Sequence, residues 1–284
     1  MLAFAHERIR PDGRYLRPEG QALSFDSNPT STARERPSQT VIIPAYNESF
    51  RIASSLRSVL AYLAEQDYEA NVLLVDDGST DDTATAARIV IHEFPNLEVH
   101  TIPHSGKASA VLWGLEHANG ELILFADADL ATPITYLGKF REAVAGGADV
   151  VIGSREGETA TRIGEPEFRH LMGRGFNALV RILLLPGIHD TQCGFKLFTS
   201  AARDEILPRL RLYRTPDGEI NSPKVTAFDV ELLVVARRLG LDIAIEPVTW
   251  TYGEQSKVNP IGDTFTNFSD VANVKWNDLW RRYR

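Results

Sequence analysis

Cysteine, positive charge and long apolar stretches are all scarce in this chain of 284 residues, and each shortage excludes a class of protein. The single cysteine, Cys193, rules out a fold held by intrachain disulfides and is compatible with a reducing compartment. With 38 acidic and 30 basic residues the net charge is -8, so the chain has no global positive field to collect nucleic acid polymers. An anionic ligand must therefore meet a local cluster of cations.

No stretch of the sequence has the length and hydrophobicity of a membrane span. The N-terminus lacks the uninterrupted apolar core of a signal peptide because polar and charged side chains occupy residues 6–8 and 10. The most apolar internal run, residues 178–188, contains Arg181 and falls far short of the roughly 20 residues that cross a bilayer. We expect a cytoplasmic protein without a transmembrane helix, in which any peripheral membrane contact comes from the C-terminal tail. The oligomeric state stays open.

The order of apolar residues predicts one large α/β domain with two appendages. Residues 1–38 mix Pro, Gly, Ser and Arg without periodicity, which predicts a flexible arm. From Thr40, short β-branched runs alternate with amphipathic segments, the pattern of βαβ units in a mainly parallel sheet. This alternation is regular over residues 39–153 and irregular over residues 154–258. Residues 259–284 form an amphipathic tail that contains Trp276 and Trp280.

Polar clusters follow the expected strands at the points where these strands end. The strands are expected at residues 41–45, 72–76, 97–102, 121–126 and 150–153, and the helices between them near Ser49, Asp81, Lys107 and Pro133. Thr80 or Asp81 can cap the second of these helices, and Pro133 suits a first turn. Later elements are expected at residues 167–185 (helix), 194–198, 227–239 (helix) and 265–284 (helix), with a mobile loop at 212–224. Ligands bind outside the carboxyl ends of parallel strands, so residues 46–48, 76–79 and 127–129 are expected in one site.

Asp127 and Asp129 are the strongest candidates for a metal site. Residues two apart at a strand end point the same way, so these two carboxylates repel unless a cation lies between them. Mg²⁺ or Mn²⁺ bound by one or two carboxylates completes its coordination with diphosphate oxygens and water. The pair therefore predicts a diphosphate holder, and a solvated acidic turn is the alternative.

Other side chains near the expected edge can bind a nucleotide or a second substrate. Asp77 can accept hydrogen bonds from a uracil imide or a ribose hydroxyl, and Lys107 can approach a phosphate. Three arginines form a local basic concentration on the acceptor side that is suited to the phosphate of an acceptor, namely Arg155, Arg169 and Arg174. Two acidic candidates remain in the second half: Asp190, and the pair Asp229 and Glu231. On a helix Asp229 and Glu231 face apart, so only one of them can point into a site.

The ordered set of motifs resembles family 2 of the inverting glycosyltransferases, which have the GT-A fold. The matching segments are residues 41–48, Asp76-Asp77-Gly78-Ser79-Thr80-Asp81 and Asp127-Ala128-Asp129. Residues 153–155, 190–198 and 227–233 look like those of the dolichyl-phosphate β-glucosyltransferases in particular. The resemblance covers roughly residues 40 to 258. It divides the domain into a nucleotide-sugar half at 39–153 and an acceptor half at 154–258.

The resemblance also implies roles for individual residues. Uridine is expected on Pro44, Ala45, Tyr46, Glu48 and Asp77, and the metal diphosphate on Asp127, Ala128 and Asp129. Asp229 takes the base or acceptor-facing position, and Asp190 and Gln192 belong to the acceptor side. Related mannosyltransferases often have Gln where this chain has Ala131, which favours UDP-glucose over GDP-mannose as donor.

The sequence thus predicts a metal-dependent inverting glycosyltransferase that transfers glucose from UDP-glucose to a polyprenyl phosphate. A soluble hydroxyl acceptor and a non-catalytic nucleotide-sugar binder are the alternatives. A phosphohydrolase with a nucleophilic Asp is disfavoured because Ala131 stands where its motif needs Thr or Val. A dinucleotide-binding oxidoreductase is disfavoured because no glycine-rich turn follows the first strand.

Overall fold

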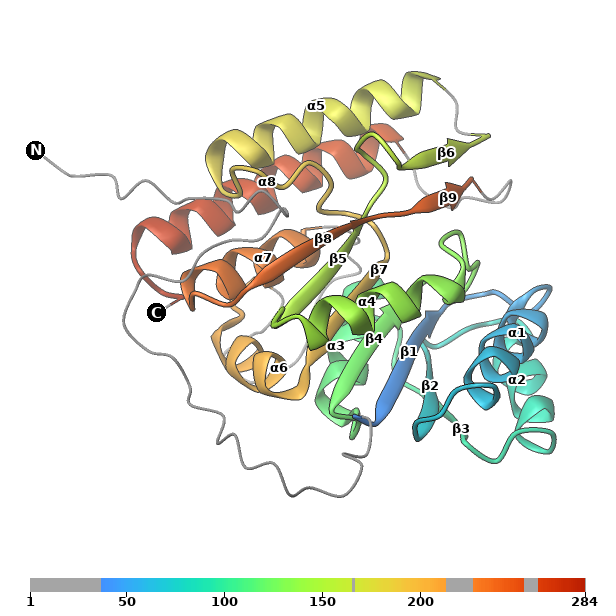
Figure 1. Ribbon diagram of the computed structural model, residues 1–284. Helices are drawn as coiled ribbons and strands as arrows, with labels where there is room; N and C mark the ends of the chain where they lie inside the picture. Colours follow the sequence, from blue (N-terminus) through green and yellow to red (C-terminus); the bar gives the residue numbers. More distant parts are fainter. Residues whose placement is uncertain (1–36, 165–166, 213–226, 253–259, 284) are drawn as a thin grey trace, which may run out of the picture.

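The computed structural model of the chain describes residues 37–164, 167–212, 227–252 and 260–283, and side chains within these ranges except those of 167–172 and 260–267 (Figure 1). The predicted arm at 1–38, apart from its last two residues, and the predicted mobile loop, apart from Leu212, lie outside the described residues.

A seven-stranded sheet runs through both halves of the domain in the order β3-β2-β1-β4-β7-β5-β8. The strands are β1 (Gln39–Ala45), β2 (Ala70–Asp76), β3 (Leu97–Thr101), β4 (Leu122–Ala126), β5 (Val150–Ser154), β7 (Phe195–Thr199) and β8 (Ile243–Pro247). Neighbouring strands are parallel except for β7, which is antiparallel to both β4 and β5. The predicted α/β class with a mainly parallel sheet is confirmed.

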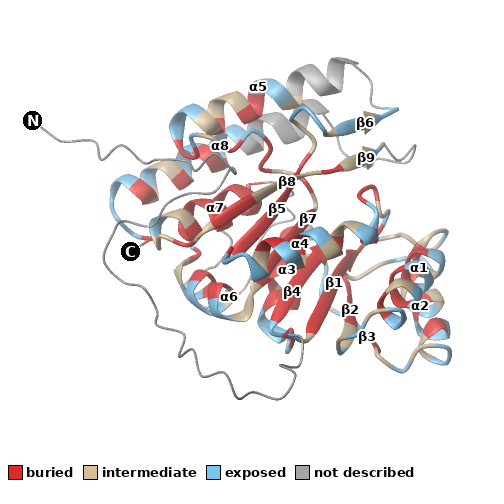
Figure 2. Cartoon of the chain, in the orientation of Figure 1, coloured by how far each residue is buried: buried red, intermediate tan, exposed pale blue. Residues whose placement is uncertain are grey.

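Helices cover both faces of this sheet, which is why the central strands are apolar at almost every position. The helices are α1 (Ile52–Ala64), α2 (Thr83–Ile91), α3 (Lys107–His117), α4 (Leu137–Ala145), α5 (Glu167–Leu183), α6 (Ser200–Ile206), α7 (Phe228–Arg238) and α8 (Pro260–Leu279), with 3₁₀ turns η1 (Ile134–Tyr136) and η2 (Leu207–Arg209). Successive residues of β1 enter opposite cores, Ile42 with α3 and α7 and Ile43 with α1, α2 and α4. Figure 2 shows the resulting buried centre. A small parallel ladder of β6 (Thr161–Ile163) and β9 (Thr249–Thr251) lies apart from the main sheet.

Strand β7 determines what lies at the carboxyl edge. It enters the sheet between β4 and β5, and its first residue, Phe195, pairs with Ala126, the last residue of β4. Because β7 runs the opposite way, the segment that precedes it, residues 190–194, lies at the carboxyl ends of its parallel neighbours. The sequence predicted the short element at 194–198 that forms β7, but it did not predict the direction of this strand.

Three local predictions need correction. The first helix begins at Ile52 and not at Ser49, because residues 48–52 form a turn in which Glu48 O accepts the N–H groups of Arg51 and Ile52. The second helix begins at Thr83 and not at Asp81. Of the two predicted capping residues, Asp81 is the one that accepts the Thr83 N–H, at 3.0 Å. Pro133 is extended, with ψ 139°, so it precedes η1 and is not part of a helical turn.

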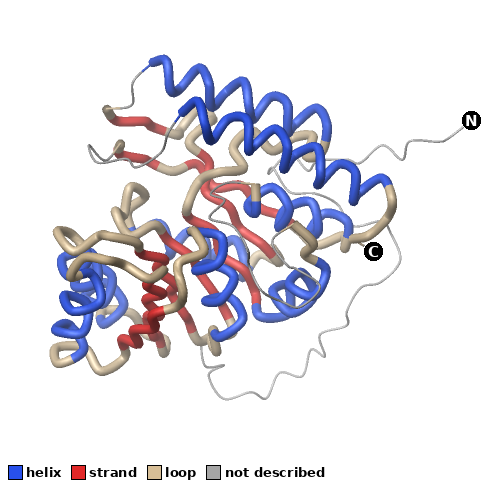
Figure 3. Tube along the Cα trace, turned by 180° about the vertical axis from the view of Figure 1, so that it is seen from behind, coloured by secondary structure: helices blue, strands red, loops and turns tan. Residues whose placement is uncertain are grey.

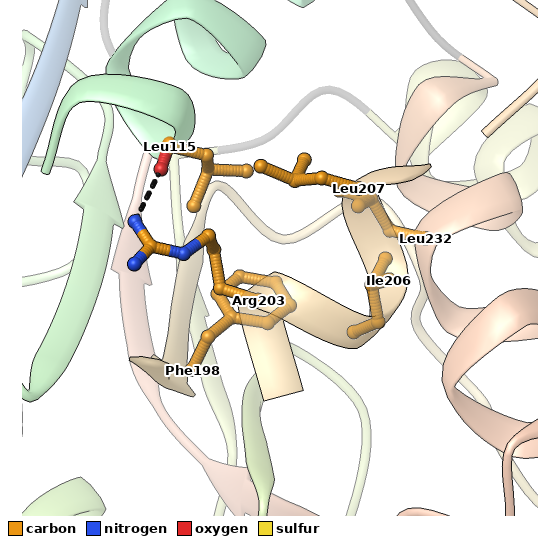
Figure 4. A pocket seen from close by; sticks show the side chains of 6 residues that line it. All are labelled: Leu115, Phe198, Arg203, Ile206, Leu207 and Leu232. Carbon is orange, nitrogen blue, oxygen red and sulfur yellow. Dashed lines mark hydrogen bonds between the residues drawn. The ribbon is translucent and has the colours of Figure 1, made fainter. Parts of the chain in front are cut away.

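The far end of α3 is fixed by α6. Arg203 Nη1 donates to the carbonyl oxygens of Leu115 and Ala118, at 2.8 and 2.9 Å, and so satisfies carbonyls that end the helix. Figure 4 shows this guanidinium beside a small recess lined by the apolar side chains of Leu115, Phe198, Ile206, Leu207 and Leu232. This recess lies at the opposite end of α3 from Lys107, and it is a packing feature of the core.

Helices α5 and α8 lie side by side and run in the same direction (Figures 1 and 3). The Phe176 and Phe268 rings meet edge to face with centroids 6.4 Å apart. Nearer the C-terminal ends of the two helices, Lys275 Nζ donates to Leu183 O at 2.7 Å. The amphipathic helix predicted in the tail is confirmed, although it begins at Pro260. No helix in the described part of the chain is both long enough and apolar enough to span a membrane.

Candidate functional site

The Asp-x-Asp loop and the segment before β7 are in direct contact at the carboxyl edge. Asp127 N–H donates to Gly194 O at 3.1 Å, and a Cβ atom on Gly194 would lie 2.0 Å from Asp127 Oδ2. Only glycine therefore allows this approach. Leu130 has φ 49°, a left-handed conformation that is uncommon for Leu, and it closes the turn in which Ala131 N donates to Asp129 Oδ1 at 3.0 Å.

The two carboxylates of this loop differ in how well nearby cations compensate them. Lys107, the first residue of α3, places Nζ 2.5 Å from Asp127 Oδ1. Among the described residues, the cation that pairs with Asp129 is Arg51, whose Nη1 is 4.0 Å from Oδ2. Burial and the charge of Asp127 raise the pKa of Asp129, although the charges of Lys107 and Arg51 oppose this effect.

The donor set fits a hard divalent cation. Asp127 Oδ1 is a buried oxygen that accepts no hydrogen bond of good geometry within the described residues, despite its closeness to Lys107. The described residues contain no group of three or more His, Cys, Asp or Glu side chains that could hold a metal ion without other ligands. Two carboxylates that leave the remaining positions to phosphate and water are what Mg²⁺ or Mn²⁺ takes in phosphate-binding sites.

Asp77 organises the loop that leads into α3. Its buried carboxylate accepts the N–H groups of Ser105 and Gly106, each at 2.8 Å, and lies 2.8 Å from His104 Nδ1. The His104 ring stacks on Tyr46 with a centroid separation of 4.1 Å. Two residues that the sequence assigns to uridine binding, Tyr46 and Asp77, are thus joined through His104, which sequence reasoning did not single out for that role.

The loop after β1 is tied to the loop after β2 and carries a charge pair. Asn47 N–H donates to Ser79 Oγ at 2.9 Å, and Asn47 Oδ1 accepts the N–H of Thr80 at 2.8 Å. Glu48 Oε2 lies 3.0 Å from Arg51 Nε. Pro44 and Ala45 end β1 beside Val75 and Asp76 of β2, so the nucleotide-site candidates of both strands share this edge. Arg51, which approaches Asp129, was missed by the sequence analysis.

Asp229 forms a buried ion pair with Lys196. Lys196 Nζ donates to Asp229 Oδ1 at 2.6 Å and to Cys193 O at 2.5 Å, and its side chain is 0% exposed. Burial raises the pKa of Asp229, although the charges of Lys196 and Lys107 oppose this effect. Desolvation lowers the pKa of Lys107, which is partly buried, but the negative charges of Asp127 and Asp229 outweigh this effect and raise it. Sequence reasoning missed Lys196, although its position inside the apolar run Phe-Lys-Leu-Phe could have indicated a buried, paired lysine.

The prediction that Asp229 and Glu231 face apart is confirmed. Asp229 points to Lys196, whereas Glu231 accepts the N–H groups of Arg211 and Leu212 and the hydroxyl of Tyr283, at 2.8 to 2.9 Å. Glu231 therefore belongs to the framework, whereas the charges of Lys107 and Asp127 act on Asp229.

Arg155 and Asp190, both predicted on the acceptor side, bind each other. Nε and Nη2 of Arg155 donate to the two oxygens of Asp190 at 2.7 and 2.8 Å, and the Arg155 N–H adds a third bond at 2.9 Å. Although burial favours the neutral acid, these contacts hold the pKa of Asp190 well below its usual range. Gln192 N–H also donates to Asp190, at 3.2 Å. Of the other predicted arginines, Arg174 is exposed on α5, and the side chain of Arg169 lies outside the described ones.

Comparisons with known proteins agree with this geometry. The sequence model of glycosyl transferase family 2 matches residues 40–207. A dolichyl-phosphate beta-glucosyltransferase of Trichomonas vaginalis is 32% identical over 272 residues, which cover 92% of this chain and 75% of that protein. The human dolichyl-phosphate beta-glucosyltransferase is 32% identical over 285 residues, covering 95% and 84% respectively. That of Saccharomyces cerevisiae is 34% identical over 266 residues, covering 86% and 76%.

Solved structures show the fold. Glucosyl-3-phosphoglycerate synthase from Mycobacterium tuberculosis, in complex with Mn²⁺, UDP and glucosyl-3-phosphoglycerate, matches with a TM-score of 0.60 at 18% identity, over 84% of this chain and 80% of that one. The same enzyme with Mn²⁺, UDP-glucose and phosphoglyceric acid matches with a TM-score of 0.59. The predicted GT-A fold is confirmed. Because the family's sequence model spans more than half of the chain and relatives above 30% identity extend over most of it, the chain belongs to glycosyl transferase family 2 and is a glycosyltransferase.

Proposed function

We propose that the chain transfers glucose from UDP-glucose to a polyprenyl phosphate, with inversion at the anomeric carbon, and that Asp127 and Asp129 hold the Mg²⁺ or Mn²⁺ that the reaction uses. Inverting transfer is a single displacement in which negative charge grows on the departing UDP. The principal requirement of the site is therefore positive charge next to the diphosphate.

The observation that carries this proposal is the charge deficit at Asp129. Close ion pairs join Asp127 to Lys107, Asp190 to Arg155 and Asp229 to Lys196, at 2.5, 2.7 and 2.6 Å. Within the described ranges, the one ion pair of Asp129 is the contact of 4.0 Å with Arg51. A divalent ion bound here supplies Lewis-acid stabilisation of the leaving diphosphate. Lys107, at the N-terminus of α3, adds a side-chain cation beside the same loop.

Support for the donor comes from the loop residues and from the relatives. The Tyr46–His104 stack and the Asp77 loop give a base a flat aromatic surface beside hydrogen-bonding groups. The curated relatives are named as glucosyltransferases, and the fold neighbour was solved with UDP-glucose. Ala131, two residues after the acidic pair, favours UDP-glucose over GDP-mannose.

Support for the acceptor comes from the state of Asp229. A phosphate monoester has a second pKa near roughly 6, so it is mostly dianionic at neutral pH and needs no base to become a nucleophile. A sugar or alcohol hydroxyl needs one. The ammonium group of Lys196 opposes protonation of Asp229, although burial raises the pKa of this carboxyl overall. The curated relatives of the chain are named for dolichyl phosphate.

A hydroxyl acceptor is the second candidate, and the raised pKa of Asp229 favours it. The two candidates respond differently to Asp229→Asn. With a phosphate acceptor the variant keeps measurable transfer, whereas with a hydroxyl acceptor it loses the roughly 10²- to 10⁴-fold contribution of a general base.

The direct test supplies labelled UDP-glucose, Mn²⁺ and a short-chain polyprenyl phosphate in detergent. We expect label in the organic phase. Transfer instead to a soluble sugar or glycerate-type acceptor, with none to the lipid, would reject the acceptor proposal.

The metal assignment has its own test, Asp129→Asn. Removal of this carboxylate should lower the transfer rate at least roughly 100-fold, because the leaving diphosphate loses its principal counter-charge. EDTA should have the same effect on the parent protein. Asp67→Asn, at an exposed position after α1, is the matched control and should retain the parental rate. A parental rate in Asp129→Asn would contradict the assignment.

A further inference from the structure

Large apolar side chains that are exposed gather on one part of the molecule. Among the described residues, six of nine such side chains belong to α5, α8 or the residue after α8. These are Ile182, Leu183, Phe268, Trp276, Leu279 and Trp280. Apolar side chains scattered singly over a surface need no explanation, but a concentration does.

Five of the six lie together at the C-terminal ends of the two helices. Lys275 Nζ bonds Leu183 O, which places the end of α5 beside the last turns of α8. The Trp276 and Trp280 rings are 5.7 Å apart. Figure 2 shows exposed residues along the outer sides of both helices, and Figures 1 and 3 show these helices side by side. We call this group of Ile182, Leu183, Trp276, Leu279 and Trp280 the α5–α8 face.

The exposed charged side chains described on α5, α8 and the residues after α8 are all positive. Arg281 and Arg282 follow Trp280 and are exposed, and Arg174 is exposed further along α5. The two acids among the described side chains of α8, Asp270 and Asp278, are 2% and 9% exposed, and Asp278 is paired with Arg238. No exposed Asp or Glu occurs among the described side chains of residues 173–189 and 268–283. The local charge is therefore positive, although the net charge of the whole chain is -8.

We propose that the α5–α8 face binds the surface of a bilayer that contains anionic lipids. Tryptophan is amphipathic and settles at the boundary between headgroups and acyl chains, leucine and isoleucine add apolar area below it, and arginine attracts anionic headgroups. The packed side of α8, with Val271 and Val274 in the core, leaves the opposite side free to lie in the plane of the membrane.

The same helices reach the acceptor side of the site. Asn177 on the inner side of α5 lies 3.2 Å from Thr191 Oγ1, next to Asp190 and its Arg155 partner. On the other side, Tyr283 and Asp278 tie α8 to α7, the helix that carries Asp229. A membrane bound at the α5–α8 face would therefore hold the site at a fixed height above the lipid headgroups.

The test is flotation of the full chain with vesicles. We expect the chain to bind vesicles of phosphatidylcholine with phosphatidylglycerol, to bind vesicles of phosphatidylcholine alone more weakly, and to lose binding as salt is raised. Trp276→Ser combined with Trp280→Ser should weaken binding roughly tenfold or more on both kinds of vesicle. Arg281→Glu combined with Arg282→Glu should remove the preference for the anionic vesicles.

The matched control is Arg88→Glu combined with Ile89→Ser on α2, which removes one exposed cation and one exposed apolar side chain far from the α5–α8 face. Its vesicle binding should equal that of the parent. Failure of the parent chain to float, or unchanged binding by the tryptophan variant, would overturn the proposal. So would sedimentation that shows a dimer which the tryptophan variant dissociates, since a second copy would then cover this face.

Vesicle binding is measured without sugar transfer, so the outcome does not depend on the proposed acceptor. If the proposed acceptor is also correct, the tryptophan variant should keep the parental rate on short-chain polyprenyl phosphate in detergent and lose rate on the long-chain lipid in vesicles. Vesicle binding without any transfer to lipid would leave this inference standing and reject the proposed acceptor.

Discussion

At the scale of single residues, the carboxylates of the edge differ in their counter-charges: among the side chains that the structure describes, Asp129 has no cation closer than Arg51, at 4.0 Å. Burial and Asp127 raise its pKa, so the folded protein binds that proton more tightly than the unfolded chain does. The stability this provides is present at low pH and is lost as pH rises through the folded-state pKa. At neutral pH without metal, ionised Asp129 therefore destabilises the fold.

A stability prediction follows for Asp129→Asn. In EDTA at neutral pH the variant should melt at a temperature equal to or above that of the parent, and its advantage should shrink as pH is lowered toward the range where Asp129 is protonated. Thermal unfolding followed by circular dichroism at several pH values measures this. A variant that melts well below the parent at neutral pH would mean that Asp129 is a structural residue.

Gly194 is the other residue on which the edge depends. In Gly194→Ala the new methyl group would lie 2.0 Å from an Asp127 oxygen, so the Asp-x-Asp loop or the segment before β7 must move. A displacement of this kind should reduce transfer roughly 100-fold, because reacting groups must be held within a fraction of an ångström.

Gly138→Ala in α4 is the control for Gly194→Ala, because its Cβ would meet only Tyr62 Oη at an ordinary 3.7 Å. Alanine is also the better helix former, so this variant should retain activity and melt no lower than the parent. Equal activity of the two glycine variants would show that the contact between the loops is not needed.

At the scale of elements, α8 is held to α7 by two polar contacts at its C-terminal end. Arg238 Nη2 donates to Asp278 Oδ2 at 2.6 Å, and the Tyr283 hydroxyl donates to Glu231 Oε1 at 2.8 Å. The second contact is fully buried, so its loss leaves a carboxylate with one donor fewer in a place that water does not reach.

Tyr283→Phe should therefore cost about 1.5 to 3 kcal/mol of unfolding free energy, the range for hydrogen bonds to charged groups. Denaturant unfolding of Tyr283→Phe, Glu231→Gln and the double variant gives the coupling between them. Costs that simply add would mean that the two side chains do not interact. The transfer rate per folded molecule should stay within a few-fold of the parent, because neither side chain faces the site.

At the scale of the whole molecule, the proposed donor site combines groups from separate parts of the chain, so ligand binding should stabilise the entire fold. UDP with Mn²⁺ should raise the melting temperature far more than UDP alone, because the metal links carboxylate to phosphate and binding stabilises by mass action. Asp77→Ala should lessen the shift by loosening residues 104–106. Equal stabilisation by GDP would contradict the assignment of uridine.

Much of the fold could be predicted because its signals are local. Alternation along β1, β2 and β4 and the polar residues at their ends follow from periods of two and from turn chemistry within a few residues. These rules were enough to bring Tyr46, Asp77, Asp127 and Asp129 to one edge of a mainly parallel sheet and to predict that Asp229 and Glu231 face apart. The GT-A resemblance came from the same short segments.

Only the tertiary structure decided which charges meet. Lys196 reaches Asp229, and Arg155 reaches Asp190, because β7 enters the sheet antiparallel between β4 and β5, and strand order is not encoded in any local window. The same holds for the α5–α8 face, whose apolar residues are separated by about 90 positions and meet because both helices pack on one side of the sheet. Sequence by itself determined the chemistry available at the edge, and the order of the strands determined how that chemistry is paired.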